Sequence, residues 1–432
     1  MKIKIHRGTG EIGGTCIEVF TETTHILLDF GMPLVNPDQT PFDSRSIRGL
    51  DAKTLIERGV LPDVPAVHGP SDTHLILSHA HKDHYGLLPW FHESCTTWLS
   101  PASMELIELT GIFTMDRCRV PNPRYFEPGV PFCIGDMEIT PWPMDHSAFD
   151  SYGFLIRSGG KRLFYTGDFR KHGRKPETFR FLEEKGPKNV DCLLMEGTAI
   201  GWEGEFDTEK MIEDAFAAEF SDSPGPHLVY TSCQNTDRLV SIFNACRRAG
   251  KTLAIDFYPA SVLKRLSRFS NLPVPSEANP EIKVFFPYGL CRMMTDQGLE
   301  REFMYPFAPF KIKREEMDEM AENLVMLVRP SFHKMLESFE NLSGGTFIYS
   351  MWDGYKEDEK YQGFIQMLRE KGMHEKDLHT CGHADRQALS DMVNLLNPAS
   401  IIPIHTFEAD TFVRVFEGRR VLRAVDGVAF SI

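Results

Sequence analysis

The feature that most constrains the fold of this chain is residues 78–84, which read SHAHKDH. They directly follow the apolar run 75–77, which is typical of a buried β-strand. The first two histidines project to the same side of an extended segment, whereas the aspartate and the third histidine fall where the chain turns into a predicted helix. Imidazole and carboxylate groups are ligands of zinc and, less selectively, of manganese or iron. The motif therefore predicts a site for two metal ions at the end of a strand.

Four further polar residues lie at predicted strand ends or in a loop beside one. Asp29, Asp168 and His405 each follow an apolar run, and His146 lies in the loop before a predicted strand over 152–157. A polar residue at a strand end is more often a turn former than a ligand. One motif cannot complete two coordination spheres, however, so the four residues together are candidate ligands.

The pattern of predicted secondary structure changes along the chain. Short β-rich runs separated by turns fill the first two hundred residues. From residue 206 to 345, strands and helices alternate, as in the strand 227–231 and the helix 237–249. This rhythm predicts a parallel sheet with helices around it. The pair Gly344-Gly345 then interrupts the pattern.

The composition limits the cellular compartment and the binding partners that we expect for the protein. The chain has 432 residues, of which 47 are basic and 61 acidic, and its formal net charge of −14 argues against indiscriminate binding of nucleic acid. No apolar run is long enough to span a membrane, and the first residues lack the apolar core of a secretory signal. The nine cysteines are scattered, with no two spaced as C-x-x-C. We therefore expect a cytoplasmic protein with no membrane partner.

The order of these motifs resembles that of the metallo-β-lactamase fold superfamily. The resemblance covers residues 1 to about 200 and about 345 to 432, and it implies an αββα sandwich with the site at one edge of two packed sheets. It also implies two divalent metal ions, zinc or else manganese. One ion would be held by His79, His81 and His146, and the other by Asp83, His84 and His405, with Asp168 bridging the two and Asp29 orienting ligands through hydrogen bonds.

The segment between the last two ligands resembles a particular branch of that superfamily. Residues 201–345 correspond to the inserted domain of the β-CASP nucleases, a group that includes ribonuclease J. Glu196, His383 and His405 fall on motifs A, B and C of the group, and histidine at motif C accompanies RNA substrates there. The expected organisation is thus a discontinuous metallo-β-lactamase domain, 1–200 and 346–432, with an inserted α/β domain on a parallel sheet at 201–345.

The resemblance implies hydrolysis of RNA phosphodiester bonds by a metal-bridging hydroxide. The expected catalytic residues are Asp83, His383 and Glu196, with His383 protonating the leaving oxygen and Glu196 orienting it. The sequence leaves two other interpretations open, because His383 could instead cap a helix start and Glu196 could be a structural carboxylate.

Substrate contacts are predicted from basic clusters and from the inserted domain. The candidates are Asn235, Arg238, Arg170 and Cys381, although the basic residues between 238 and 268 could equally be solvated helix faces. Gln234 and Cys381 occupy positions where the family has serines of a terminal-phosphate pocket. This departure argues against an exonuclease that depends on a 5′-phosphate.

Three other functions remain to be distinguished from an RNA hydrolase. A β-CASP nuclease acting on DNA is disfavoured by the motif C histidine, and a hydrolase of a small ester or lactone is disfavoured by the inserted domain. A non-catalytic assembly subunit is disfavoured because all seven ligand positions are filled. The oligomeric state is open, with a homodimer among the alternatives.

Overall fold

The computed structural model describes residues 1–357 and 359–432 and divides into two compact units. The split unit consists of Met1–Phe206 and Gly382–Ile432, and the inserted unit of Asp207–Cys381. The boundary expected at residue 345 is therefore wrong. Strand β16 (Thr346–Tyr349) pairs in parallel with β12 of the inserted unit, so Gly344, with φ at +79°, is a turn before another strand of the same sheet.

The first sheet of the split unit has the strand order β19-β1-β2-β3-β4-β5-β6. Strands β1 to β3 are antiparallel neighbours, whereas β3 to β6 run parallel, so the carboxyl ends of β3 and β4 meet at one edge. The strands are β1 (Lys2–Arg7), β2 (Cys16–Phe20), β3 (His25–Leu28), β4 (His74–Ile76), β5 (Thr96–Leu99), β6 (Pro123–Tyr125) and β19 (Ala429–Ser431).

The second sheet has the order β18-β11-β10-β9-β8-β7. Strand β18 pairs in parallel with β11, which places Ile404 opposite Glu196 although the inserted unit separates them in sequence. The strands are β7 (Phe132–Ile134), β8 (Met137–Met144), β9 (Ser151–Ser158), β10 (Lys161–Tyr165), β11 (Cys192–Glu196) and β18 (Ile401–Ile404).

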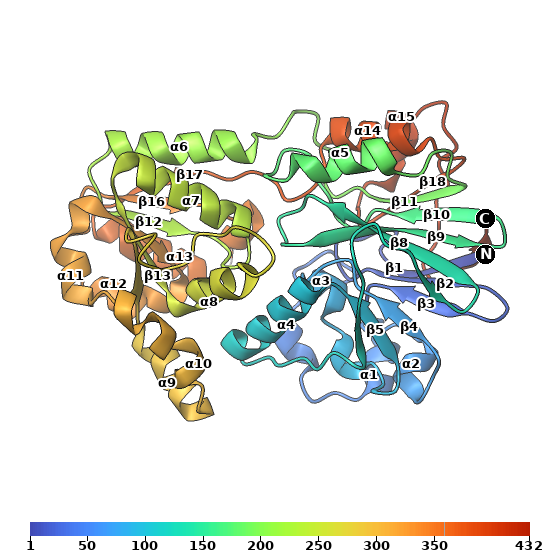
Figure 1. Cartoon of the computed structure of the whole chain (residues 1–432), viewed down its shortest axis with the longest axis horizontal. Helices are drawn as coiled ribbons and strands as arrows, with labels where there is room; N and C mark the ends of the chain where they lie inside the picture. Colours follow the sequence, from blue (N-terminus) through green and yellow to red (C-terminus); the bar gives the residue numbers. More distant parts are fainter. Residues whose placement is uncertain (358) are drawn as a thin grey trace. The chain divides into compact units, whose positions relative to one another are not determined.

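Two apolar cores fix the layers of the split unit. The first lies between the sheets, where Leu28 and Ile76 pack with Phe154 and Ile156. The second covers the outer face of the second sheet, so the apolar runs of β10 and β11 are buried on both faces. The helices that cover this outer face are α5 (Pro176–Lys185), α14 (Arg386–Leu396) and α15 (Ala409–Val415). The helices that lie beside the first sheet are α1 (Ala52–Glu57), α2 (Pro65–His68), α3 (Lys82–Tyr85) and α4 (Pro101–Thr114) (Figure 1). This is the expected αββα sandwich.

The inserted unit is built on a parallel sheet, as the βα rhythm predicted. Its order is β14-β13-β15-β12-β16-β17, and every pair in it is parallel. The other strands are β12 (His227–Tyr230), β13 (Thr252–Asp256), β14 (Ile282–Phe285), β15 (Leu324–Val328) and β17 (His374–Asp377). The helices are α6 (Glu209–Asp222), α7 (Thr236–Ala249), α8 (Phe257–Leu266), α9 (Tyr288–Gln297), α10 (Glu300–Phe303), α11 (Arg314–Glu319), α12 (His333–Glu337) and α13 (Glu359–Glu370).

Short 3-10 helices complete the described elements. They are η1 (Ser44–Ile47), η2 (Leu88–Trp90), η3 (Tyr305–Phe310), η4 (Ala321–Asn323), η5 (Pro330–Phe332) and η6 (Asp353–Glu357). Among all the helices that the structure describes, none combines the length and the apolar character that crossing a membrane would require.

His227 is an unusual residue in the core of the inserted unit. It begins β12 and is completely buried, and neither ring nitrogen has a hydrogen-bond partner among the described residues. Burial, reinforced by the positive charge of Lys251, lowers the pKa of His227 to about 4, although Glu219 acts in the opposite direction. The folded unit therefore requires the neutral imidazole.

We expect His227 to make the inserted unit sensitive to acid. In the unfolded chain the imidazole of His227 is protonated near pH 6.5, whereas in the folded unit it is protonated only near pH 4. The contribution of the neutral imidazole to stability is therefore complete above pH 6.5 and is lost as the pH falls towards 4. The loss amounts to at most about 3 kcal/mol. His227→Leu should remove this part of the pH dependence in urea unfolding, while the control His374→Leu, on exposed strand β17, should not. An unchanged pH profile in His227→Leu would contradict the assignment.

Candidate metal centre

The motif of residues 78–84 lies where β4 gives way to α3. His81 is the residue before α3 and has extended backbone, and the amide of His84 donates to its carbonyl at 2.9 Å. This abrupt turn folds the chain back on itself, so the rings of His79 and His84 lie 4.1 Å apart between centroids. The motif thus contributes possible ligand atoms to two adjacent groups of side chains.

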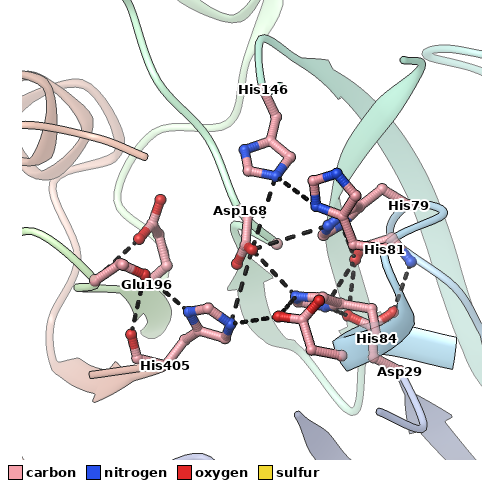
Figure 2. Close-up of polar contacts among 12 residues, drawn as sticks. Asp29, His79, His81, His84, His146, Asp168, Glu196 and His405 are labelled. Atoms are coloured by element: carbon pink, nitrogen blue, oxygen red, sulfur yellow. Dashed lines mark hydrogen bonds and ion pairs between the residues drawn. The ribbon is translucent and has the colours of Figure 1, made fainter. Parts of the chain in front are cut away.

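The first donor group consists of three imidazoles. One ligand atom from each of His79, His81 and His146 lies within 4.8 Å of the others. His146 follows β8, and its Nδ1 donates to the carbonyl of Gly382 at 2.6 Å, which leaves Nε2 only 3.2 Å from Nδ1 of His81. The three rings converge from two segments of the split unit, residues 78–84 and the loop after β8 (Figure 2).

The second donor group contains two carboxylates and two imidazoles. Asp83, His84, Asp168 and His405 offer ligand atoms within 4.8 Å of one another. His405 follows β18 directly, in the left-handed conformation with φ at +52°, and its Nε2 lies 3.3 Å from Oδ2 of Asp83. The residue that follows β18 therefore meets the motif that follows β4.

Asp168 lies between the two groups. Its Oδ2 is 3.8 Å from Nε2 of His79 and 3.9 Å from Nε2 of His146, which belong to the first group. The same oxygen is 3.1 Å from Nε2 of His84 and 3.8 Å from Nε2 of His405, which belong to the second. One carboxylate oxygen thus faces both groups (Figure 2).

Asp29 holds the second group in place from behind. Its fully buried carboxylate accepts hydrogen bonds from the amide and hydroxyl of Ser78, each at 2.7 Å, and from the hydroxyl of Tyr165 at 2.5 Å. It also accepts from Nδ1 of His84 at 2.8 Å, which turns Nε2 of that ring towards Asp168. This is the orienting role expected of a residue behind a metal ligand.

The imidazoles of the first group are favoured in the neutral form. Burial, with repulsion from the neighbouring histidines, lowers the pKa of His79 and of His146 well below the usual value. Burial likewise lowers the pKa of His81 to about 4. A neutral imidazole offers a nitrogen lone pair, which is the form that binds metal ions.

The carboxylates of the second group are favoured in the ionised form. Burial opposes the ionisation of Asp168, but the charges of His405 and His84 outweigh it and hold its pKa well below the usual range. Burial is similarly outweighed at Asp83, whose pKa falls to about 2 beside His84 and His405. At His84 burial is outweighed by Asp168, Asp29 and Asp83, which raise its pKa. Both carboxylates are therefore favoured in the form that binds a cation.

Nε2 of His79 is buried and makes no hydrogen bond with any described residue, while Nδ1 of the same ring lies 2.9 Å from the hydroxyl of Ser78. A buried nitrogen without a partner costs roughly 1–3 kcal/mol. Together with the neutral imidazoles and ionised carboxylates around it, this lone pair fits a divalent metal ion.

Glu196 and His383 adjoin the second group. Oε1 of Glu196 accepts from the amide of Phe169 at 3.1 Å and lies 3.3 Å from Nδ1 of His383. His383 is also 3.8 Å from Oδ2 of Asp168, and its side chain is 21% exposed, so a substrate can reach it. The cap of α14 is Asp385, which accepts from the amide of Ala388, so His383 does not serve as the helix cap.

Comparison with known proteins shows which families the chain resembles. Residues 58–218 match the family described as the beta-lactamase superfamily domain. This part of the chain is therefore similar to that family. Ribonuclease J of Helicobacter pylori strain J99 is 28% identical over 428 residues, covering 94% of this chain and 56% of the relative. Ribonuclease J of Methanocaldococcus jannaschii is 23% identical over 423 residues, covering 92% and 89%.

Over most of its length the chain is thus similar to proteins named ribonuclease J. It spans little more than half the length of several bacterial relatives, 60% of the one from Sinorhizobium meliloti and 56% of those from Helicobacter pylori. Among solved structures, a protein of unknown function from Enterococcus faecalis V583 has a TM-score of 0.78 at 20% identity, covering 99% of both chains. That similarity extends the shared fold over the inserted unit as well.

The residues predicted to contact substrate have other partners. Arg170 is buried, and its Nε lies 3.3 Å from Oδ1 of Asp145. Arg238 is buried too, with its Nε 2.8 Å from Oε1 of Glu209. Both predictions are therefore wrong, because each guanidinium neutralises a buried carboxylate of the fold. Asn235 caps α7 by accepting from the amide of Arg238, and Cys381 is half-buried at the end of the inserted unit.

Three residues that support the site escaped the sequence analysis. Ser78 and Tyr165 donate to Asp29, and the hydroxyl of Thr198 lies 2.8 Å from Nδ1 of His405. Thr198 stands two residues after Glu196, and that proximity was the available signal. Tyr165 gave none, because an aromatic residue in an apolar strand has the pattern of core packing.

We expect Asp29→Asn to destabilise the split unit. The amide would turn an N–H towards donors at Ser78, His84 or Tyr165, so the free energy of unfolding should fall by about 2–4 kcal/mol in thermal or urea unfolding. Asp136→Asn is the matched control, because this exposed carboxylate also accepts from three hydroxyls, those of Thr21, Thr23 and Ser158. Equal losses in both variants would contradict the central role of Asp29.

Proposed function

We propose that the protein hydrolyses RNA phosphodiester bonds with the aid of two divalent metal ions. The observation that carries the proposal is the position of Asp168, whose Oδ2 faces imidazole nitrogens of both donor groups at 3.1–3.9 Å. The names of the relatives favour RNA as the substrate, since ribonucleases J match nearly the whole of this chain.

Each ion would have its own ligands, with Asp168 common to both. His79, His81 and His146 would hold one ion, and Asp83, His84 and His405 the other. Zinc suits this mixture of imidazole and carboxylate donors, and manganese is the alternative. When bound, such ions act as Lewis acids that lower the pKa of the attacking water and neutralise charge on the phosphate.

His383 would protonate the leaving 3′-oxygen. Its Nδ1 faces Oε1 of Glu196, which would hold that ring proton and leave Nε2 as the donor to the substrate. Glu196 is itself fixed by the amides of Phe169 and Thr198. Asp83 would complete the catalytic set by orienting His405, and the products would carry a 5′-phosphate and a 3′-hydroxyl.

The proposal is tested by substrate choice and metal removal. The full chain is incubated with 5′-labelled RNA, single-stranded DNA of the same sequence and nitrocefin, with and without EDTA. We expect cleavage of RNA alone, its loss in EDTA, and its recovery when zinc or manganese is restored. Intact RNA in the presence of both metals would refute the proposal, whereas preferential cleavage of DNA or of nitrocefin would support the competing functions.

The role of His383 predicts a separation of activity from metal content. His383→Ala should lower the rate of RNA cleavage by about 100-fold or more, as expected for loss of a general acid. Metal content measured by mass spectrometry should remain that of the unaltered protein. His68→Ala, which removes an exposed histidine of the split unit, should change neither. Loss of metal in His383→Ala would identify it as a ligand instead.

A further inference from the structure

The inserted unit contains a pocket that the proposed chemistry does not use. It has a volume of about 230 Å³ and lies at the carboxyl ends of β12, β13 and β15. Ligands of open parallel α/β sheets bind at this edge. The residues that matter here are Thr231, Asp256, Tyr258, Arg329, Phe332 and Met351, all within the inserted unit.

One wall of the pocket is flat and rigid. The guanidinium of Arg329 lies 4.7 Å from the ring centre of Phe332 and 5.7 Å from that of Tyr258. Asp256 fixes it from one side, with Oδ2 at 2.5 Å from Nη2, and is itself fixed because it accepts from the amide of Tyr258 at 2.8 Å. Guanidinium and aromatic groups in one wall favour a planar ligand.

The charge of the pocket does not select an anion. Asp256 and Arg329 neutralise each other, so the wall offers polar atoms without a net positive charge. This distinguishes the pocket from a phosphate site, which requires unpaired basic groups or convergent amides. An uncharged ring is the better match.

One polar atom of the pocket lacks a hydrogen bond. The hydroxyl of Thr231 is buried and has no hydrogen-bond partner among the described residues. A hydroxyl can both donate and accept, so it can bond to either kind of polar group on the edge of a ring.

We propose that this pocket binds a single nucleobase, packed against the wall of Arg329, Tyr258 and Phe332 and hydrogen-bonded at its edge by Thr231. Its volume is below the roughly 300–1,000 Å³ of pockets for drug-sized ligands, which suits one base rather than a longer segment. The base belongs either to a free nucleoside or to an RNA strand, and only the second source rests on the proposed function.

Binding is measured on the full chain in EDTA, so that the readout does not depend on cleavage. Adenosine, guanosine, cytidine and uridine are titrated by calorimetry, with ribose and inorganic phosphate as controls. We expect at least one nucleoside to bind and neither control to do so. Thr231→Val should weaken binding about fivefold, the effect of losing one hydrogen bond.

A matched variant removes a similar hydroxyl elsewhere. Thr97, in β5 of the split unit, also has a buried hydroxyl without a hydrogen bond, so Thr97→Val should leave nucleoside affinity unchanged. Met351→Trp should fill the pocket and abolish binding, and circular dichroism checks that each variant folds. The absence of nucleoside binding, equal affinity in Thr231→Val, or displacement by phosphate would overturn the proposal.

The same titration identifies the source of the base. A short RNA oligonucleotide that displaces the bound nucleoside assigns the pocket to an RNA strand. An oligonucleotide that does not compete assigns it to a free nucleoside. Either outcome is compatible with failure of RNA cleavage, so the two proposals can be judged separately.

Discussion

The hydrogen bonds to the carboxylate of Asp29 join the parts of the split unit at the edge where the candidate metal centre lies. Asp29 directly follows β3 in the first sheet, Ser78 and His84 are the first and last residues of the motif that follows β4, and Tyr165 ends β10 in the second sheet. A buried carboxylate is costly unless donors surround it, so the four hydrogen bonds constrain all of these segments at once. The orientation of His84 towards Asp168 follows from that constraint.

The arrangement also explains why residues far apart in sequence can form one site. Parallel pairing of β3 with β4 and of β11 with β18 brings four carboxyl strand ends to one edge. The middle of each strand is apolar, and a polar residue ends the strand or follows it closely. The sheet therefore gathers donor groups without needing any of them to be adjacent in the chain.

Most residues of the candidate metal centre could be predicted because each is marked by a pattern within a few neighbouring residues. An apolar strand ending in Asp29, Asp168 or His405 is visible in a few residues, and so is the motif at 78–84. Long-range pairing gave no such signal. Gly344-Gly345 has the same appearance between two domains as between two strands of one sheet, and Arg238 on a helix has the same appearance whether it meets a phosphate or the buried Glu209. The predicted boundary at residue 345 and the predicted substrate contacts of two arginines were wrong because each depended on pairing between residues far apart in the sequence.

The pairing of β18 with β11 also has a consequence for the order of events during synthesis. His405 reaches the centre only after the entire inserted unit has left the ribosome, because that unit separates β11 from β18 in sequence. Until then the nascent chain carries His79, His81 and His146 but lacks one member of the second donor group. The position of a single strand thus delays the complete set of donor residues until the inserted unit has been synthesised.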